Sequence, residues 1–367
     1  MPKIPAHSCL LALCAACAFP ALPCPGQQSD SAPIVLHAAR LLEVDTGTLL
    51  KPGEVLVVRD RIRAVGVSVE HPQGAKVIDL GDTTLLPGLI LAAYVCARVL
   101  EVAPSPFART VPRLAVVALD VLSAAAFALV DGRRRYGLRG MLVFCGICVV
   151  VGNAIENLGV VTGFPYGHYY FADLMGPKLF HVPVLLGLAY IGMAYVSWTV
   201  GQALAGNAAR ISQHASVLAT PLVAAFVMVA WDLAQDPVWA TALHGWVWRD
   251  GGSWFGVPVS NYLGWYGTVF TIYVLFSLYL KRRPAPAAGS SNSSGRTAIL
   301  FYAVCAAGNV GQMLARGNGE LVRDPSGQFW RVEDITAASA MVSIFGMGAF
   351  AVIAWIRSHQ ERIAATG

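Results

Sequence analysis

Seven long apolar segments, separated by short polar stretches, fill most of this chain after residue 110. They occupy residues 112–130, 138–161, 182–204, 214–235, 261–280, 297–315 and 336–356. An α-helix needs about 20 mostly apolar residues to cross the hydrocarbon core of a bilayer, and each segment is close to that length. Because a chain inside the bilayer must satisfy its own backbone hydrogen bonds, such segments fold as helices. The pattern therefore predicts an all-α polytopic membrane domain at residues 91–367, with the lipid bilayer as its solvent.

A weaker apolar run at residues 85–103 would add an eighth span, so the prediction is seven to eight transmembrane helices. The composition agrees, because 56% of the residues are hydrophobic and only 13% are charged, whereas soluble chains carry about 25% charged residues. Basic residues lie at the ends of apolar segments, which fits the loops of a multi-pass protein and gives no indication of nucleic-acid binding. We expect a multi-pass protein of the bacterial inner membrane.

The first 90 residues have a different character. Residues 1–24 contain one lysine, a short apolar run and a proline, a pattern typical of a secretory signal peptide. Residues 33–90 contain β-branched runs such as IVLHAARLLEV and GEVLVVRDRIRAVG, separated by turn-forming stretches. These runs predict a small antiparallel β unit.

The stretch GAKVIDLGDTTLLPGLI closes this β unit and resembles the N-terminal β-sandwich of amidohydrolases related to imidazolonepropionase. In that family the motif precedes a His-x-His pair that binds the catalytic metal at the mouth of a barrel. Here Ile90 is followed by LAAYVCARVL, and none of the eight histidines belongs to such a pair. The resemblance therefore implies an amidohydrolase-like fragment without the metal-binding barrel. We expect no metal site, and we expect the fragment to be dispensable for activity.

Three carboxyl groups inside the apolar segments are the strongest candidates for chemistry, because ionisable groups at membrane depth are costly and are usually functional. Glu156 lies in the middle of an apolar run, with Asn153 one turn earlier. Asp232 and Asp236 are four residues apart, so they share one face of a helix. We expect Pro237 to end that helix, which would let water reach the pair.

Two loops rich in glycine, proline and aromatic residues, at 162–183 and 244–265, accompany these acids. Asp173 in the first loop is a reserve candidate for the catalytic acid or base. Two interpretations of the aromatic residues remain open, namely a belt at the membrane interface and a wall that stacks on an apolar ligand and faces a cation. In the second interpretation the substrate contacts would be Tyr169, Tyr170, Trp231, Trp246, Trp248, Asn153 and Asn261.

The same region carries eight short elements in a fixed order: ENLG, TGFPYG, GPKL, VP, DLAQDP, GWVW, FGVP and SNYLGW. These elements resemble the CruF-type carotenoid hydratase family of integral membrane proteins, and the resemblance extends over about residues 95–357. It implies the addition of water to the terminal double bond of an acyclic carotenoid end group, which gives a tertiary alcohol. It also implies an acyclic carotenoid as the substrate and other enzymes of carotenoid biosynthesis as candidate partners.

Water addition to an unactivated alkene needs a proton donor, a cation-tolerant wall and a base near one water molecule, but no cofactor. We expect Glu156 to be the general acid, because desolvation favours the protonated form of a carboxyl group. Asp232, or its neighbour Asp236, is expected to orient or deprotonate the incoming water. Two alternatives remain open: a carotenoid end-group cyclase, which excludes water, and a non-catalytic pigment- or lipid-binding protein.

The distribution of basic residues also predicts which loops face the cytoplasm. The arginines at 133–135 follow the first apolar segment and the basic residues at 281–283 follow the fifth, so both loops fall on the same side of the membrane. We expect reporter fusions at residues 135 and 285 to be read out in the cytoplasm. A periplasmic readout at either position would contradict this topology.

Overall fold

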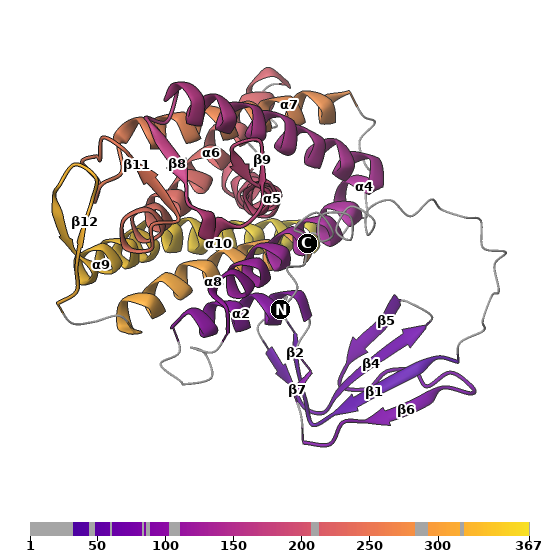
Figure 1. The fold of residues 1–367 in the computed structure, drawn as a ribbon. Coiled ribbons are helices and arrows are strands. Elements are labelled where there is room, and N and C mark those ends of the chain that lie inside the picture. Colours follow the sequence, from indigo (N-terminus) through magenta and orange to yellow (C-terminus); the bar gives the residue numbers. More distant parts are fainter. Residues whose placement is uncertain are drawn as a thin grey trace, which may run out of the picture. The chain divides into compact units, whose positions relative to one another are not determined.

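The computed structural model describes residues 32–43, 48–58, 61–82, 84–85, 89–102, 111–206, 213–282, 293–315 and 319–366. The chain divides into a β unit that ends at Leu85 and a helical unit that begins at Leu86 (Figure 1). The predicted signal-peptide segment at residues 1–24 lies outside the described residues, as does position 285 of the proposed topology test.

The β unit contains two small sheets. The first has the strand order β5-β4-β1-β6 and the second the order β3-β2-β7. The strands are β1 (Ile34–Ala38), β2 (Arg40–Glu43), β3 (Thr48–Leu50), β4 (Gly53–Val58), β5 (Arg61–Gly66), β6 (Lys76–Asp79) and β7 (Thr84–Leu85). The antiparallel prediction holds for β1–β4, β4–β5 and β2–β3, but β1–β6 and β2–β7 are parallel. The prediction fails for β6 and β7 because each joins an earlier strand after a longer crossover connection. Such a connection gives a parallel pair, whereas a hairpin gives an antiparallel one.

The helical unit consists mainly of long apolar helices. They are α2 (Leu89–Val102), α4 (Arg113–Thr162), α5 (Val184–Ala205), α6 (Gln213–Pro237), α7 (Val259–Lys281), α8 (Ser293–Ala315), α9 (Val332–Val342) and α10 (Gly348–Thr366). Among the described residues, six helices are long and apolar enough to cross a membrane: Arg113–Thr162, Val184–Ala205, Val217–Ala242, Val259–Lys281, Gly295–Ala315 and Val332–Gln360. The predicted polytopic helical membrane protein with a small β unit is confirmed.

Helix α4 accounts for two of the predicted spans. Its 50 residues would extend over roughly 75 Å if straight, more than twice the thickness of a bilayer core. Gly137 interrupts the helix with φ 71° and ψ 169°, a conformation that suits a residue without a Cβ atom. The Met141 side chain lies against Gly132, so the chain turns back at this point. The two arms of α4 therefore correspond to the predicted segments 112–130 and 138–161.

Within residues 84–85 and 89–102, which are the described part of the weak eighth candidate at residues 85–103, the structure gives no spanning helix. Helix α2 has only 14 residues, which is about 21 Å and shorter than the hydrocarbon core. Residues 84–85 before it belong to a strand of the β unit. An apolar run of this length is more typical of a helix packed inside a protein than of a membrane span.

Helix α6 ends at Pro237, as predicted, but the expected access of water to Asp232 and Asp236 at this end is not found. The chain continues through a π-helical turn, η3 (Val238–Ala242), in which the Leu243 amide donates to the Val238 carbonyl oxygen at 2.9 Å. Pro237 has φ −62° and ψ −33°, values that fit a helix, and a proline removes only its own amide donor. Asp232 and Asp236 are consequently buried, with 3% and 2% of their surfaces exposed, instead of lying at a wet helix end.

Short two-stranded sheets connect the helices at one end of the unit. The strand β8 (Tyr169–Phe171) pairs with β11 (Trp246–Trp248), β9 (Lys178–Leu179) with β10 (Val182–Pro183), and β12 (Leu321–Arg323) with β13 (Phe329–Arg331). The first of these sheets joins the two aromatic loops that the sequence placed beside the candidate acids. It therefore brings residues far apart in sequence to one site.

Helix α5 is the centre of the helical unit (Figure 1). Every residue from 190 to 201 is buried, so the helix is surrounded on all faces. Gly192 packs against Ala124 of α4, and Gly201 packs against Ala224 of α6. Membrane helices commonly use such small residues to bring their backbones close together. These contacts fix α4 and α6, which carry the candidate acids, around α5.

We expect Gly192→Leu to destabilise the protein and Gly187→Leu to have little effect. A Cβ atom at Gly192 would lie 2.7 Å from Ala124 Cβ, whereas one at Gly187 on the same helix would meet nothing within 4 Å. Overpacking of this kind typically costs about 1–3 kcal/mol. Thermal unfolding in detergent measures the difference, and equal melting temperatures of the two variants would contradict the packing of α5.

Candidate functional site

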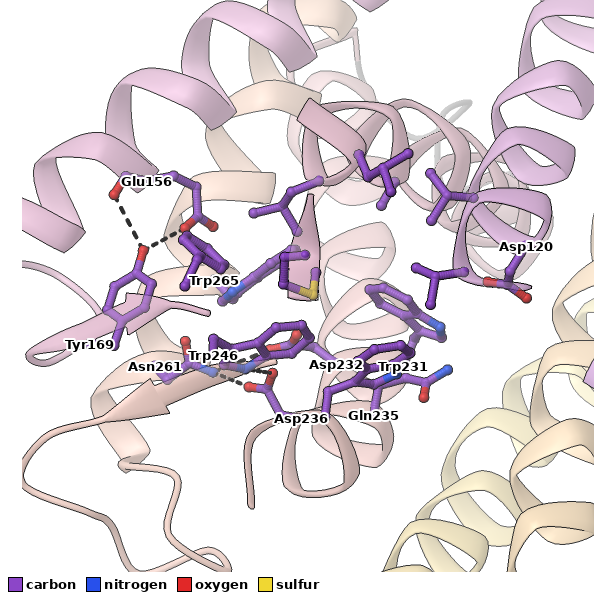
Figure 2. Close-up of a pocket in the computed structure, with 18 of the residues that line it drawn as sticks. Asp120, Glu156, Tyr169, Trp231, Asp232, Gln235, Asp236, Trp246, Asn261 and Trp265 are labelled. Atoms are coloured by element: carbon purple, nitrogen blue, oxygen red, sulfur yellow. Dashed lines mark hydrogen bonds between the residues drawn. The ribbon is translucent and has the colours of Figure 1, made fainter. Parts of the chain in front are cut away.

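A cavity in the helical unit gathers most of the predicted site residues (Figure 2). Its volume is about 90 Å³. Eight of the eleven predicted residues line it: Glu156, Tyr169, Trp231, Asp232, Asp236, Trp246, Trp248 and Asn261. They come from α4, α6, α7, β8 and β11, so the site exists only in the folded helical unit.

Glu156 of α4 is held by two tyrosine hydroxyl groups. Tyr169 Oη of β8 donates to Glu156 Oε2 at 2.5 Å, and Tyr190 Oη of α5 donates to Oε1 at 2.7 Å. Only 2% of the Glu156 surface is exposed, and no basic side chain among the described residues forms an ion pair with it. Burial and the nearby Glu156 carboxyl group raise the pKa of Tyr169 well above its usual value, so this hydroxyl remains a neutral donor.

The pairing of β8 with β11 sets the aromatic side of the cavity. Tyr169 lies opposite Trp248, and their rings stack with centroids 5.7 Å apart. Because side chains on a strand alternate between its faces, the next residue, Tyr170, points away and is 44% exposed. The Arg249 guanidinium lies 5.9 Å from its ring centroid. The structure thus brings Tyr169, but not Tyr170, to the cavity.

Asp232 and Asp236 form the second acidic group of the cavity. They lie one turn apart on α6 and share the amide of Asn261, from the first turn of α7. Asn261 Nδ2 donates to Asp236 Oδ2 and, at 3.5 Å, to Asp232 Oδ2. Trp246 Nε1 donates to Asp236 Oδ1 at 3.1 Å. Two neighbouring carboxyl groups with so few donors are best accommodated when they share a proton.

Further aromatic residues complete the wall, and the sequence analysis had not assigned them to the site. Trp265 stacks on Tyr190 with centroids 4.7 Å apart and an angle of 5°. Trp239 stacks on Trp246 at 6.0 Å and 12°. Trp265 lies four residues after Asn261, a spacing that places both on one helix face and that would have identified it. Tyr190 reaches Glu156 from another helix, so no local spacing indicates its role.

Two other predicted residues lie away from the cavity. Asn153 accepts a hydrogen bond from Asn157 Nδ2 at 2.8 Å and lines a separate surface hollow beside His181, because residues three apart on a helix differ by about 60° in direction. Asp173 begins the short helix η1 (Asp173–Met175), is exposed and pairs with Lys178 Nζ at 3.4 Å.

The opposite side of the cavity is also polar. It is lined by Arg98 and Glu101 of α2 and by Asp120 of α4, none of which the sequence analysis had singled out. Within the part of the chain that the structure describes, no three His, Cys, Asp or Glu side chains are grouped as ligands for a metal ion. The cavity therefore combines the Glu156 and Asp232–Asp236 carboxyl groups, the charged cluster around Arg98 and an aromatic wall.

Comparisons with known proteins bear on this region. A family model described as "Carotenoid biosynthesis protein" matches residues 113–317. Bisanhydrobacterioruberin hydratase from Haloarcula japonica is 32% identical over 145 residues, which cover 39% of this chain and 45% of that protein. The match therefore spans less than half the length of this curated relative. No solved structure matches the chain significantly.

The family match excludes residues 33–90, whose amidohydrolase-like character stays a prediction. It includes Glu156, Asp232 and Asp236, and it confirms the predicted kinship with proteins of carotenoid biosynthesis. Because it covers more than half of the chain, this chain belongs to the carotenoid biosynthesis protein family.

Proposed function

We propose that the chain adds water to the terminal double bond of an acyclic carotenoid end group and so forms a tertiary alcohol. The observation that carries the proposal is the Glu156 carboxyl group, which is buried at an aromatic cavity and held by two tyrosine hydroxyls. The Asp232–Asp236 pair supplies a separate carboxyl site in the same cavity. Hydration of an alkene requires a general acid that protonates the double bond and a general base that takes a proton from the attacking water.

Glu156 gives the proton in this proposal. Each carboxyl oxygen has two lone pairs, so a protonated Glu156 can accept from Tyr169 and Tyr190 and still direct its own O–H at the substrate. The π electrons of the double bond take this proton, a C–H bond forms, and the other alkene carbon becomes a tertiary cation. The same two tyrosine hydroxyls then stabilise the Glu156 carboxylate, because they already point at its oxygens.

The aromatic wall stabilises the cation. The faces of tryptophan and tyrosine rings attract a positive charge within about 6 Å of the centroid, most strongly when water is absent. Stacking holds the ring planes of Trp265 and Trp246 in fixed orientations. The wall is therefore built before the charge develops, and it needs no reorganisation during the reaction.

Water captures the cation on the side of Asp232 and Asp236. Asn261 and Trp246 fix the Asp236 oxygens, whereas Asp232 has one long hydrogen bond, at 3.5 Å. Asp232 is therefore the freer acceptor for the proton of the attacking water. As the water oxygen forms a bond to the tertiary carbon, one of its protons passes to this carboxylate. The net change is alkene plus water to tertiary alcohol.

The cavity favours hydration over cyclisation, the first alternative. A buried water needs about 10–15 Å³ and two to four polar partners, and a cavity of about 90 Å³ lined by five carboxyl groups provides both. A cyclase must keep water away from the same cation. Nor does a purely pigment-binding role account for three buried carboxyl groups, since burying polar groups costs free energy unless they serve a purpose.

The relative from Haloarcula japonica carries the name of a hydratase, which supports the same class of reaction. An acyclic carotenoid is insoluble in water, so the substrate must reach the cavity from the bilayer. Our proposal therefore includes a location in the bacterial inner membrane. It also includes other enzymes of carotenoid biosynthesis as the source of the substrate.

We expect Glu156→Gln to lower turnover by about 10²–10⁴-fold, the usual contribution of general acid catalysis. Glutamine keeps the shape of the side chain and can accept from one tyrosine through its amide oxygen and donate to the other through its NH2 group, but it has no acidic proton to give. The measurement is mass analysis of the carotenoids in a lycopene-producing host, at matched protein levels. The hydrated product gains the mass of one water molecule per reacted end.

Asp173→Asn is the matched control, because Asp173 is exposed and lies away from the cavity. It should turn over like the wild type. If Glu156→Gln is fully active while Asp173→Asn is not, Asp173 is the acid and the proposed site is wrong. If the wild type produces only pigment of unchanged mass but with cyclised ends, hydration itself is wrong.

A further inference from the structure

A second hollow lies on the lipid-facing side of the second arm of α4. Val150, Leu158 and Val161 of this arm are 68%, 45% and 66% exposed. Because the arm is part of a membrane-spanning helix, this exposed face contacts the bilayer. The hollow has a volume of about 540 Å³ and lies between the arm and the β9–β10 hairpin. It shares no lining residue with the cavity that holds Glu156.

Hydrogen bonds fix the orientation of the two asparagine side chains in this hollow. The His181 backbone amide can only donate, so the Asn157 atom that it contacts at 3.0 Å is the oxygen Oδ1. Asn157 Nδ2 therefore faces Asn153, where it donates to the backbone oxygen and to Oδ1, each at 2.8 Å. The remaining atom, Asn153 Nδ2, has two N–H groups and donates to none of the described residues. It is not among the fully buried atoms, so a ligand can reach it.

An unused amide donor on a lipid-facing surface indicates a ligand with an acceptor oxygen, because hydrocarbon tails offer no acceptor. The hollow is polar at one end and apolar at the other. Asn157 and the exposed His181 lie at the end nearer to Thr162, where α4 ends. Val149 and Val150 lie about two turns deeper. A membrane lipid has the same order, with ester oxygens near the bilayer surface and acyl chains towards its middle.

The turn beside the hollow keeps a phenylalanine where glycine would be less strained. Phe180 and His181 connect β9 to β10, and Phe180 has a φ of 56°. Two-residue hairpin turns with a positive φ at this position favour glycine, because a side chain is strained there. The Phe180 side chain lines the hollow and is 80% exposed, so it gains little contact within the chain. The strain therefore points to a contact with a ligand that covers the ring.

We propose that this hollow binds one membrane lipid, whose acyl ester carbonyl accepts a hydrogen bond from Asn153 Nδ2. Its acyl chain then lies against Val150 and the Phe180 ring. The inference concerns a site outside the cavity and does not depend on the proposed function. Asn153 and Asn157 flank Glu156 along α4, so the bound lipid covers the outer face of the helical turn that carries the candidate acid.

Competition between two lipids tests the site. The full-length protein in detergent is mixed with equal amounts of a phosphatidylglycerol with two ester-linked chains and its ether-linked analogue. The bound lipid is identified by native mass spectrometry. The two probes share the headgroup and the chain length, but the ether-linked lipid lacks the carbonyl groups. The wild type should retain one lipid and prefer the ester about 2- to 12-fold, the effect of one hydrogen bond.

Three variants locate the effect. Asn153→Leu removes the donor at nearly constant size, so the ester-to-ether ratio should fall to one. Phe180→Gly removes the ring and relieves the turn, so less lipid should bind without any loss of thermal stability in lipid-free detergent. Leu142→Ala is the matched control, because Leu142 is 59% exposed on the same arm and does not line the hollow. It should change neither the ratio nor the amount of bound lipid.

Equal retention of the two lipids by the wild type would overturn the inference, even if Asn153→Leu fails to fold. An unchanged ratio in a folded Asn153→Leu variant would also overturn it, because the ester preference would then arise elsewhere on the protein. A wild-type dimer that Asn153→Leu converts to a monomer is a third contradicting result. In that case the Asn153 amide donates to a second copy of the chain instead of a lipid.

Discussion

The burial of one carboxyl group between two tyrosine hydroxyls is the interaction on which the rest of the site depends. Glu156 comes from α4, Tyr190 from α5 and Tyr169 from the β8–β11 sheet, so a single set of hydrogen bonds joins three separate parts of the chain. Two neutral donors can hold either protonation state of a carboxyl group, whereas a lysine or arginine would fix the charged one. A proton can therefore leave Glu156 and return to it without rearrangement of its neighbours.

Helix α6 contributes two adjacent rows of side chains to the cavity. Asp232 and Asp236 form one row of this helix, and Trp231 and Gln235 form the adjacent row, because residues four apart lie above one another. The first row faces Asn261 of α7. Helix α6 packs closely on α5, where Gly201 leaves room for the α6 backbone at Ala224. Close packing at a glycine thus places two kinds of polar group, carboxylate and amide, around one small space.

Features set by local sequence could be predicted, and those set by contacts between distant segments could not. The spanning helices follow from apolar length, and the Asp232–Asp236 pair follows from helical spacing. Tyr190 carries no local signal, because its partner comes from another helix. The placement of Tyr170 beside Tyr169 was wrong, since neighbours on a strand face opposite ways. The end of α6 at Pro237 was predicted, but the burial of Asp232 and Asp236 beside it was not, because a π-helical turn continues the chain past the proline.

Isotope labelling tests most directly whether water adds across the double bond. The protein is supplied with its carotenoid in water enriched in heavy oxygen and in deuterium, and the product is analysed by mass and by fragmentation. The account predicts one heavy oxygen on the tertiary carbon and one deuterium bound to the neighbouring carbon for each end that reacts. A product that gains no heavy oxygen, whatever its deuterium content, would contradict it.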